Sequence, residues 1–264
     1  MKLSFTKAHA TGNDFVIVYK EHNPNIVLTP NMVRFLCDRK YGVGSDGLLV
    51  IDNVVGYDFK LDYYNNDGSW ETLCANGIRC AALFMFTNAF IKNNATVLCG
   101  DGPHDIKLEK NMVTTSMKVP KYKSKVLTVN GYSGRYVDSG AKHFVVLVDN
   151  IDDINVDSEG KKIRNSSLFS PEGINVNFYS VNDNCMHVRT YEKGIESEML
   201  SCGSGSVACA YDAFNKGLVP SKVLINVKGG ELVLIANYAS SNVWLSGLAT
   251  LVYNSDIKYK EENG

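Results

Sequence analysis

Two stretches of this chain, Cys74-Ala75-Asn76-Gly77 and Cys202-Gly203-Ser204-Gly205, share one pattern, and each leads into a short, apolar, alanine-containing segment. Each segment is predicted to form a helix that begins beside the cysteine. A thiol at a helix N-terminus lies near unpartnered backbone N–H groups and the positive end of the helix dipole, which lowers its pKa and favours the thiolate. Such a cysteine can act as a base, and the repetition predicts two of them.

The alternative interpretation is that both cysteines are simply buried, which is common for free cysteines. Core packing does not require a cysteine, a small polar residue and two helix-opening backbone positions to recur together. The recurrence therefore favours a function for Cys74 and Cys202. The remaining cysteines lack this context and are expected to be structural: Cys37, Cys80, Cys99, Cys185 and Cys209.

The composition is that of an ordinary globular protein, with 45% apolar and 21% charged residues among 264. The formal net charge of −1 gives no indication of nucleic acid or an anionic membrane as a partner. Without an apolar run long enough for a signal peptide or membrane helix, a cytoplasmic location is expected. Seven cysteines favour reduced thiols over a disulfide scaffold. No metal is predicted, because CxxC pairs are missing and the five histidines are scattered.

Short β-like runs dominate the sequence, and most are bounded by Gly, Asn or Asp. The predicted strands are 15–19, 48–51, 59–64, 95–98, 143–148, 176–181, 186–191, 222–227, 232–236 and 250–253. Helical patterns are fewer, at 30–40, 77–89 and 204–216. The last two are nearly uncharged, so they are predicted to be buried helices surrounded by strands, each with its cysteine at the mouth.

Two domains of about 130 residues each fit both the chain length and the repetition, since Cys74 and Cys202 lie 128 residues apart. The polar segment 118–128 is the best candidate for a linker. We therefore expect an N-terminal domain over 1–119, completed by a C-terminal strand within 250–264, and a C-terminal domain over 120–249.

Two thiols that face each other suit one reaction in particular. To invert a carbon that bears a hydrogen, a thiolate removes the proton from one face while a thiol delivers another from the opposite face. The helix N-termini can also bind the substrate carboxylate, on which charge builds as the α-proton leaves. This mechanism needs no metal and no pyridoxal cofactor.

The segment Gly42–Gly47 matches the pattern GxGxxG, which suggests a dinucleotide-binding turn. A dinucleotide fingerprint, however, follows a strand and opens a helix, whereas this segment follows a predicted helix and precedes a strand. A helix-to-strand turn with glycines at positive φ is the better interpretation.

The chain resembles the diaminopimelate epimerase family along nearly its whole length. The motifs that carry the resemblance are 9–15 (HATGNDF), 42–49 (GVGSDGLL), 64–80 (YNNDGSWETLCANGIRC), 174–178 (INVNF) and 191–206 (YEKGIESEMLSCGSGS). The resemblance implies an α/β protein of the α+β type with two pseudo-symmetric domains. Each would be a mostly antiparallel, barrel-like sheet around a central buried helix, with the active site in the cleft between domains. It also implies a cofactor-independent epimerase of lysine and peptidoglycan synthesis that converts LL-2,6-diaminopimelate to meso-diaminopimelate. Its partner would be this small-molecule amino-acid substrate, with no nucleic acid or membrane, and a homodimer is plausible.

The resemblance further assigns roles to individual residues. Cys74 and Cys202 would be the acid/base pair, and His143 and Glu192 would tune the thiols, with Glu192 also contacting the substrate. Backbone N–H groups at the reacting centre and side chains near it or at the distal end would bind substrate; the residues concerned are Asn13, Asn65, Ala75, Asn76, Asn175, Lys193, Gly203 and Ser204. Without the family, the asparagines could equally be turn residues, Glu192 a solvated charge and His143 an ordinary strand residue.

The departures from the family pattern concentrate at the distal end of the substrate. The family usually has Asn-Pro-His where this chain has Ala141-Lys142-His143, and Glu-Arg where it has Glu192-Lys193, which replaces a bidentate guanidinium with a point charge. Gly47, Ala75 and Met199 replace a common glutamine, glycine and threonine. Two alternatives therefore stay open. The substrate could be another amino acid, such as histidine or a lanthionine-like molecule, or the thiols could form a redox pair.

Overall fold

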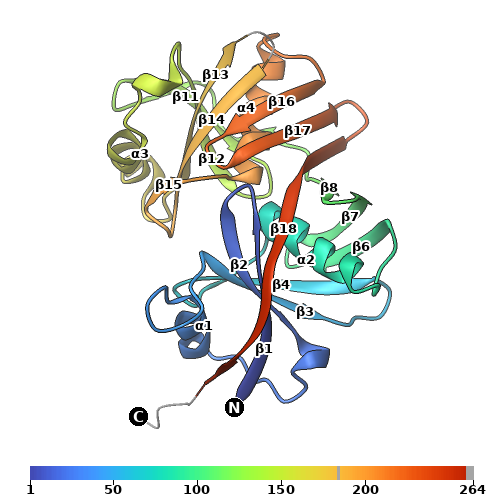
Figure 1. Cartoon of the computed structure of the whole chain (residues 1–264). Coiled ribbons are helices and arrows are strands. Elements are labelled where there is room, and N and C mark those ends of the chain that lie inside the picture. Colours follow the sequence, from blue (N-terminus) through green and yellow to red (C-terminus); the bar gives the residue numbers. More distant parts are fainter. Residues whose placement is uncertain (183–184, 260–264) are drawn as a thin grey trace. The chain divides into compact units, whose positions relative to one another are not determined.

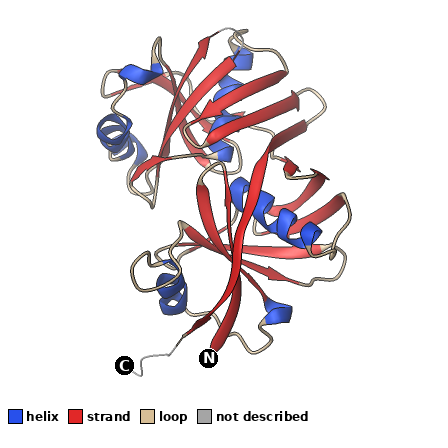
Figure 2. Ribbon diagram, in the orientation of Figure 1, coloured by secondary structure: helices blue, strands red, loops and turns tan. Residues whose placement is uncertain are grey.

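A computed structural model describes residues 1–182 and 185–259. It divides into two units: unit 1 comprises Met1–Thr115 together with the described residues from Leu248 onward, and unit 2 comprises Ser116–Gly247. Strands make up most of each unit, and helices lie against them (Figures 1 and 2). Among the described residues no helix is long and apolar enough to cross a membrane.

Unit 1 is a mixed sheet with two α-helices. Its elements are β1 (Lys2–Ala10), β2 (Asn13–Tyr19), α1 (Pro30–Cys37), β3 (Gly47–Asp52), β4 (Phe59–Asn65), β5 (Trp70–Glu71), α2 (Ala75–Thr87), β6 (Asn94–Cys99), β7 (Gly102–Glu109) and β8 (Met112–Ser116). The last strand of the chain, β18 (Asn242–Lys258), pairs with both β1 and β8. Since β8, β7, β6, β4, β3, β2 and β1 also pair in turn, the ladder closes into a barrel-like sheet.

The alternation of apolar residues explains how this sheet supports helices on both faces. Along β2, Phe15 and Ile17 belong to the core cluster that contains α2, whereas Val16 and Val18 belong to the cluster that contains α1. Successive side chains of a strand point to opposite faces, so a continuous apolar run buries both. Helix α2 is apolar on most sides and is accordingly buried along nearly its whole length.

Unit 2 is built in the same way. Its elements are β9 (Lys121–Tyr122), β10 (Leu127–Val129), β11 (Tyr132–Asp138), β12 (Lys142–Leu147), α3 (Val156–Arg164), β13 (Asn175–Asn182), β14 (Cys185–Glu192), β15 (Ser197–Met199), α4 (Gly203–Asn215), β16 (Lys222–Val227) and β17 (Gly230–Asn237). Helix α3 lies against β13 and β14, and α4 against β12, β13 and β14. Three short 3₁₀ helices complete the described structure: Lys20–His22, Ile151–Asp153 and Ser167–Phe169.

The order of strand pairings in unit 1 recurs in unit 2. From β1 to β7, successive neighbours are antiparallel, parallel, antiparallel, parallel and antiparallel. From β11 to β17 the same sequence of pairings appears. In each unit one helix connects the first parallel pair and another connects the second. The predicted strand-rich α/β fold with a barrel-like sheet is confirmed at this level.

Asp212 anchors α4 to its sheet. Its carboxylate is buried and accepts hydrogen bonds from the hydroxyls of Tyr122 in β9 (2.8 Å) and Tyr179 in β13 (2.6 Å), and it pairs with Lys216 (2.6 Å). Burial and the neighbouring carboxylate raise the pKa of the Tyr179 hydroxyl, which keeps it protonated as a donor.

Several elements differ from the sequence prediction. The predicted helices lie where α1, α2 and α4 are found, with ends shifted by at most three residues, but α3 was not predicted. The segment 118–128, expected to be a linker, contains β9 and the start of β10, which pair with β11. Strand β18 extends far beyond the predicted 250–253.

Candidate active site

Cys74 is the N-cap of α2. Its backbone is extended (φ −139°, ψ 102°), and its Sγ accepts a hydrogen bond from the backbone N–H of Gly77 at 3.3 Å. The side chain is partly exposed. Ala75 and Asn76 form the first turn that follows, where backbone N–H groups have no carbonyl of a preceding turn to bind. This is the geometry of an N-terminal anion site beside a thiol.

The glycine at the fourth position of each repeated motif is explained by close approach. A Cβ on Gly77 would lie 2.7 Å from Leu49 Cδ2, and a Cβ on Gly205 would lie 2.2 Å from Asn177 Oδ1 and 3.2 Å from Cys202 Sγ. Neither residue has a positive φ. The motif therefore needs glycine because of space, and this brings each helix start close to the sheet.

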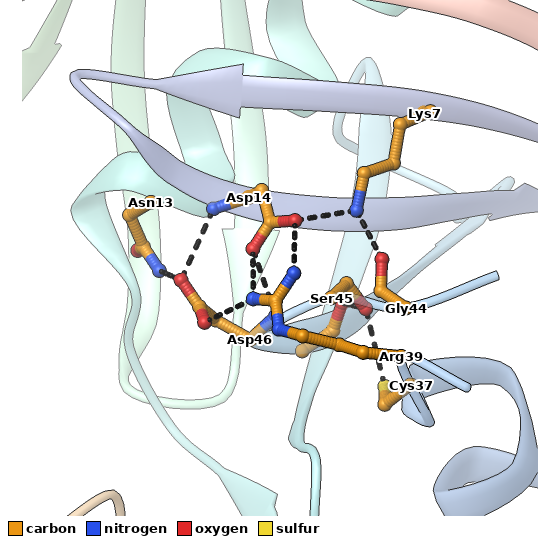
Figure 3. A network of polar contacts seen from close by, with 9 residues as sticks. Lys7, Asn13, Asp14, Cys37, Arg39, Gly44, Ser45 and Asp46 are labelled. Carbon is orange, nitrogen blue, oxygen red and sulfur yellow. Dashed lines mark hydrogen bonds and ion pairs between the residues drawn. The ribbon is translucent and has the colours of Figure 1, made fainter. Parts of the chain in front are cut away.

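A chain of amides connects the start of α2 to a cluster of charges in unit 1. Asn76 Nδ2 donates to Asn13 Oδ1 at 3.0 Å, and Asn13 Nδ2 donates to Asp46 Oδ2 at 2.8 Å. Figure 3 shows Asp46 and Asp14 held by Arg39, with Lys7 on the other side of Asp14. The bonds from Arg39 and Lys7 lower the pKa of Asp14 to about 2, against the opposing effect of its burial. Asn13 is buried, so its predicted contact with substrate stays a prediction.

Cys202 is the N-cap of α4, with a similar extended backbone (φ −128°, ψ 107°). It is more buried than Cys74, with 8% of its surface exposed. Its Sγ lies 3.7 Å from Ser204 Oγ. Gly203 and Ser204 begin the helix, so the predicted N–H pair occupies the same place as in α2.

His143, in β12, is fully buried and lies behind Ser204. Its Nε2 is 3.0 Å from Ser204 Oγ, and its Nδ1 is 2.9 Å from Asn177 Nδ2. Burial lowers the pKa of His143 to about 3, so the ring is neutral near pH 7. Since an amide nitrogen can only donate, Nδ1 accepts and the ring proton lies on Nε2, directed at Ser204. The Ser204 hydroxyl is thereby left to donate toward Cys202.

Asn177 in turn is held by Thr190, whose Oγ1 donates to Asn177 Oδ1 at 2.8 Å. Both residues are buried, and neither was among the site residues predicted from the sequence. Asn177 offered a weak signal, since it is a polar residue between Val176 and Phe178 within a predicted strand, whereas Thr190 follows Arg189 and offered none. Together they fix the amide that sets the tautomer of His143.

The residues predicted for the distal end of the substrate have local partners. Asn65 accepts from the Tyr63 hydroxyl (2.7 Å) and donates to Ser69 (3.2 Å), while Asn175 accepts from the backbone N–H of Lys193 (2.8 Å). Asn175 is the register partner of His143 in the β12–β13 pair, so it lies in the same part of unit 2. Glu192 ends β14 and is half-buried. Lys142 pairs with Glu172.

The other cysteines differ from Cys74 and Cys202 in their surroundings. Burial raises the pKa of Cys37 to about 11 and raises those of Cys80, Cys99 and Cys209 further, so these thiols stay protonated. Cys185 was grouped with these cysteines as structural, but it differs from them because it begins β14 and is partly exposed.

The turn at Gly42–Gly47 is also only partly as predicted. Gly44 alone has a positive φ, of 83°. Gly42 and Gly47 are needed for space instead, since a Cβ on Gly47 would lie 2.6 Å from both Tyr63 Cε2 and Tyr64 O. This close contact explains why no glutamine stands at position 47.

The fold places the chain in a known structural class. A probable proline racemase from Agrobacterium radiobacter K84 has the same fold, with a TM-score of 0.77 and 11% identity over 99% of this chain and 94% of its own. A PhzF-family phenazine biosynthesis protein from Bacillus anthracis matches with a TM-score of 0.72 and 14% identity, over 98% and 100%. At such low identities the likeness is one of fold.

Sequence comparison defines the family. The diaminopimelate epimerase profile matches residues 5–123 and 135–252. A diaminopimelate epimerase from Flavobacterium psychrophilum is 36% identical over 260 residues, covering 95% of this chain and 98% of the relative. One from Archaeoglobus fulgidus is 34% identical over 281 residues, covering 99% and 98%. This chain belongs to the diaminopimelate epimerase family of amino-acid epimerases, which confirms the resemblance inferred from its motifs.

Proposed function

We propose that this protein interconverts LL- and meso-2,6-diaminopimelate by a two-base mechanism in which Cys74 and Cys202 act on opposite faces of the α-carbon. The observation that carries the proposal is the matched placement of the two thiols, each the N-cap of a buried helix in its own unit. One thiolate removes the α-proton and becomes a thiol, while the opposite thiol delivers its proton and becomes a thiolate.

The helix starts supply the second part of the mechanism. As the α-proton leaves, negative charge spreads onto the substrate carboxylate. Backbone N–H groups of Ala75 and Asn76 in one unit and of Gly203 and Ser204 in the other would stabilise that charge. We propose that each unit contributes its own pair of these groups, and that Asn13 positions Asn76 at the start of α2.

The buried histidine supports a distinct role at Cys202. A neutral His143 that donates to Ser204 orients the Ser204 hydroxyl toward Cys202 Sγ, and a hydroxyl donor favours an anionic sulfur over a neutral one. We therefore propose that His143 stabilises the Cys202 thiolate that forms when Cys202 has given up its proton. Glu192 stays a candidate for contacting the substrate and tuning the thiols.

Recognition of the distal carboxylate and amine differs from the family pattern, because two usual family residues are replaced. Lys142 forms an ion pair with Glu172, so its charge is already paired within unit 2. Lys193 lies in the turn after β14, next to Asn175. These contacts keep a second candidate open, in which the same two thiols act on another amino acid, such as lanthionine or histidine.

The test compares substrates and variants in one assay. The purified protein is given LL-diaminopimelate, lanthionine or L-histidine, and the stereoisomers formed are separated and counted. We expect meso-diaminopimelate from the first substrate, and we expect Cys74→Ala and Cys202→Ala each to lower kcat by at least about 10³-fold. Turnover of lanthionine or histidine without turnover of diaminopimelate would favour the second candidate, and full activity in either alanine variant would defeat both.

A further inference from the structure

Arg79 is the largest fully buried side chain in the described structure, and it lies in the second turn of α2. Its guanidinium donates to Asn76 Oδ1 (2.6 Å), to Thr11 Oγ1 (3.3 Å) and to the Ala75 carbonyl (3.5 Å). Its buried Nε has no hydrogen-bond partner among the described residues. Every acceptor it does have is formally neutral.

This arrangement is unusual because buried charges are normally paired with an opposite charge. Arg189 shows the ordinary case in this same chain, since it binds both oxygens of Glu198 at 2.6 and 3.0 Å. For Arg79, by contrast, no carboxylate of the described residues lies within ion-pair distance, and the ionisable groups that act on it are the thiols of Cys80 and Cys74.

Only one of these two thiols is suited to carry a negative charge. Cys80 is fully buried, and burial strongly raises its pKa. Cys74 is partly exposed and accepts a backbone N–H, and it borders the same helical turn whose carbonyl and amide oxygens hold Arg79. Although burial lowers the pKa of Arg79 to about 10, the guanidinium is still protonated near pH 7.

The second half of the chain lacks this cation. Aligning the two motifs at their cysteines places Val207 of α4 where Arg79 stands in α2, and Val207 is also fully buried. Near Cys202 the buried titratable side chains include His143, which is neutral, and Cys209, whose thiol burial keeps protonated. The two halves are therefore matched in backbone but differ in charge.

We propose that Arg79 is the buried counter-charge of a Cys74 thiolate, so that Cys74 rests deprotonated and Cys202 rests protonated. This inference rests on the proposed two-thiol function and assigns the starting protonation states that this function needs. Arg79 acts as a positioning residue, because it reaches the reacting centre through Cys74 and the first turn of α2.

The same guanidinium also orients the anion-binding turn. Because Arg79 donates to Asn76 Oδ1, the amide nitrogen of Asn76 must face Asn13, and the Asn13 amide nitrogen then faces Asp46. Figure 3 shows the far end of this chain, where Asn13 points at the Asp46 carboxylate. Loss of Arg79 would leave the orientation of Asn76 unspecified.

The test measures the rate of iodoacetamide alkylation of each cysteine as a function of pH, by peptide mass spectrometry, on protein without substrate. We expect the midpoint pH for Cys74 to lie below that for Cys202. In Arg79→Met the midpoint for Cys74 should rise by about 1 pH unit or more. At a fixed pH below that midpoint, this rise is roughly a tenfold loss of Cys74 thiolate. Arg79→Lys keeps the charge and should restore most of the shift.

Val207→Met serves as the matched control, since it changes a buried residue at the same position of α4 and should leave the Cys74 midpoint unchanged. Protection of Cys80 and Cys209 from alkylation shows that each variant is folded. A lower midpoint for Cys202 than for Cys74 in the unmodified protein would overturn the proposal without any variant. An unshifted Cys74 midpoint in folded Arg79→Met would overturn it as well.

These outcomes are separate from those of the proposed function. A protein with the expected Cys74 shift that fails to epimerise diaminopimelate would contradict the function alone. Normal epimerisation with an unshifted Cys74 in Arg79→Met would contradict the counter-charge alone.

Discussion

At the scale of single residues, His143 shows how burial selects a protonation state. The ring is enclosed between Ser204 and Asn177, and no carboxylate of the described part of the chain bonds to it, so desolvation dominates and lowers its pKa to about 3. In the unfolded chain an ordinary histidine titrates near 6.5. Between these two values the unfolded state binds a proton that the folded state does not, so the folded state loses stability as the pH falls.

This difference predicts a measurable dependence of stability on pH. Lowering the pH from 6.5 to 5 should cost the folded protein about 1.6 kcal/mol through His143 alone. The free energy of unfolding in urea should therefore fall more steeply over this range in the unmodified protein than in His143→Gln. Parallel curves for the two proteins would show that His143 is not held neutral by the fold.

Asp212 is a second residue on which several contacts converge. In Asp212→Ala, two tyrosine hydroxyls and the Lys216 ammonium lose their shared acceptor, so the free energy of unfolding should fall by about 3 kcal/mol. Tyr122→Phe removes only one of these bonds and should cost about 1 kcal/mol. Equal losses in the two variants would contradict a shared acceptor.

At the scale of elements, helices α2 and α4 could be predicted because they are long, apolar and opened by the repeated cysteine motif. Helix α3 could not be predicted in the same way. It has few apolar residues, and Gly160 in its interior lowers helix propensity. Its N-cap Asn155, an acidic first turn and a basic last turn were present as signals. The structural reason for Gly160 appears only in the fold, where its Cα packs on Tyr191.

Gly160 supplies the prediction at this scale. A Cβ there would lie 2.4 Å from Tyr191 Cβ, so Gly160→Ala should lower the free energy of unfolding by about 1–3 kcal/mol through overpacking. Helix propensity alone predicts the opposite, a gain of about 1 kcal/mol. Ser158→Ala, at an exposed position of the same helix, is the control and should change stability by less than about 0.5 kcal/mol. A more stable Gly160→Ala would show that α3 does not pack closely on β14.

At the scale of the whole molecule, the repeated cysteine motif is accompanied by a repeated order of strand pairings, which the sequence did not predict. Helices α1 and α3 are counterparts, since each connects the first parallel strands of its unit. Strand β18 belongs to both units, since Asn242–Gly247 pairs with β17 and Ala249–Lys258 pairs with β1 (Figure 1). A short sequence window cannot reveal this, because much of β18 is exposed and its polar residues hide the strand pattern. The pairings that define it join residues far apart in the sequence.

In the candidate site, too, local features could be predicted from the sequence and contacts between distant segments could not. The two cysteines and their helix starts could be located from the sequence because each motif is local. The residues that give the two halves different charges, Arg79 and the set of Asn177 and Thr190 behind His143, depend on contacts between distant segments. The residue types at these positions do not indicate which distant side chains they contact.

The central claim is that two thiols act on opposite faces of one carbon, and deuterium oxide tests it most directly. LL-diaminopimelate is incubated with the enzyme in this solvent, and at low conversion the α-deuterium content of product and of recovered substrate is measured by mass spectrometry. We predict that meso-diaminopimelate carries solvent deuterium at the α-carbon, while the recovered LL substrate keeps its original α-hydrogen. The reason is that each face of the α-carbon has its own acid. Deuterium appearing in the recovered substrate as fast as in the product would show that a single base serves both faces, and it would contradict the two-thiol mechanism.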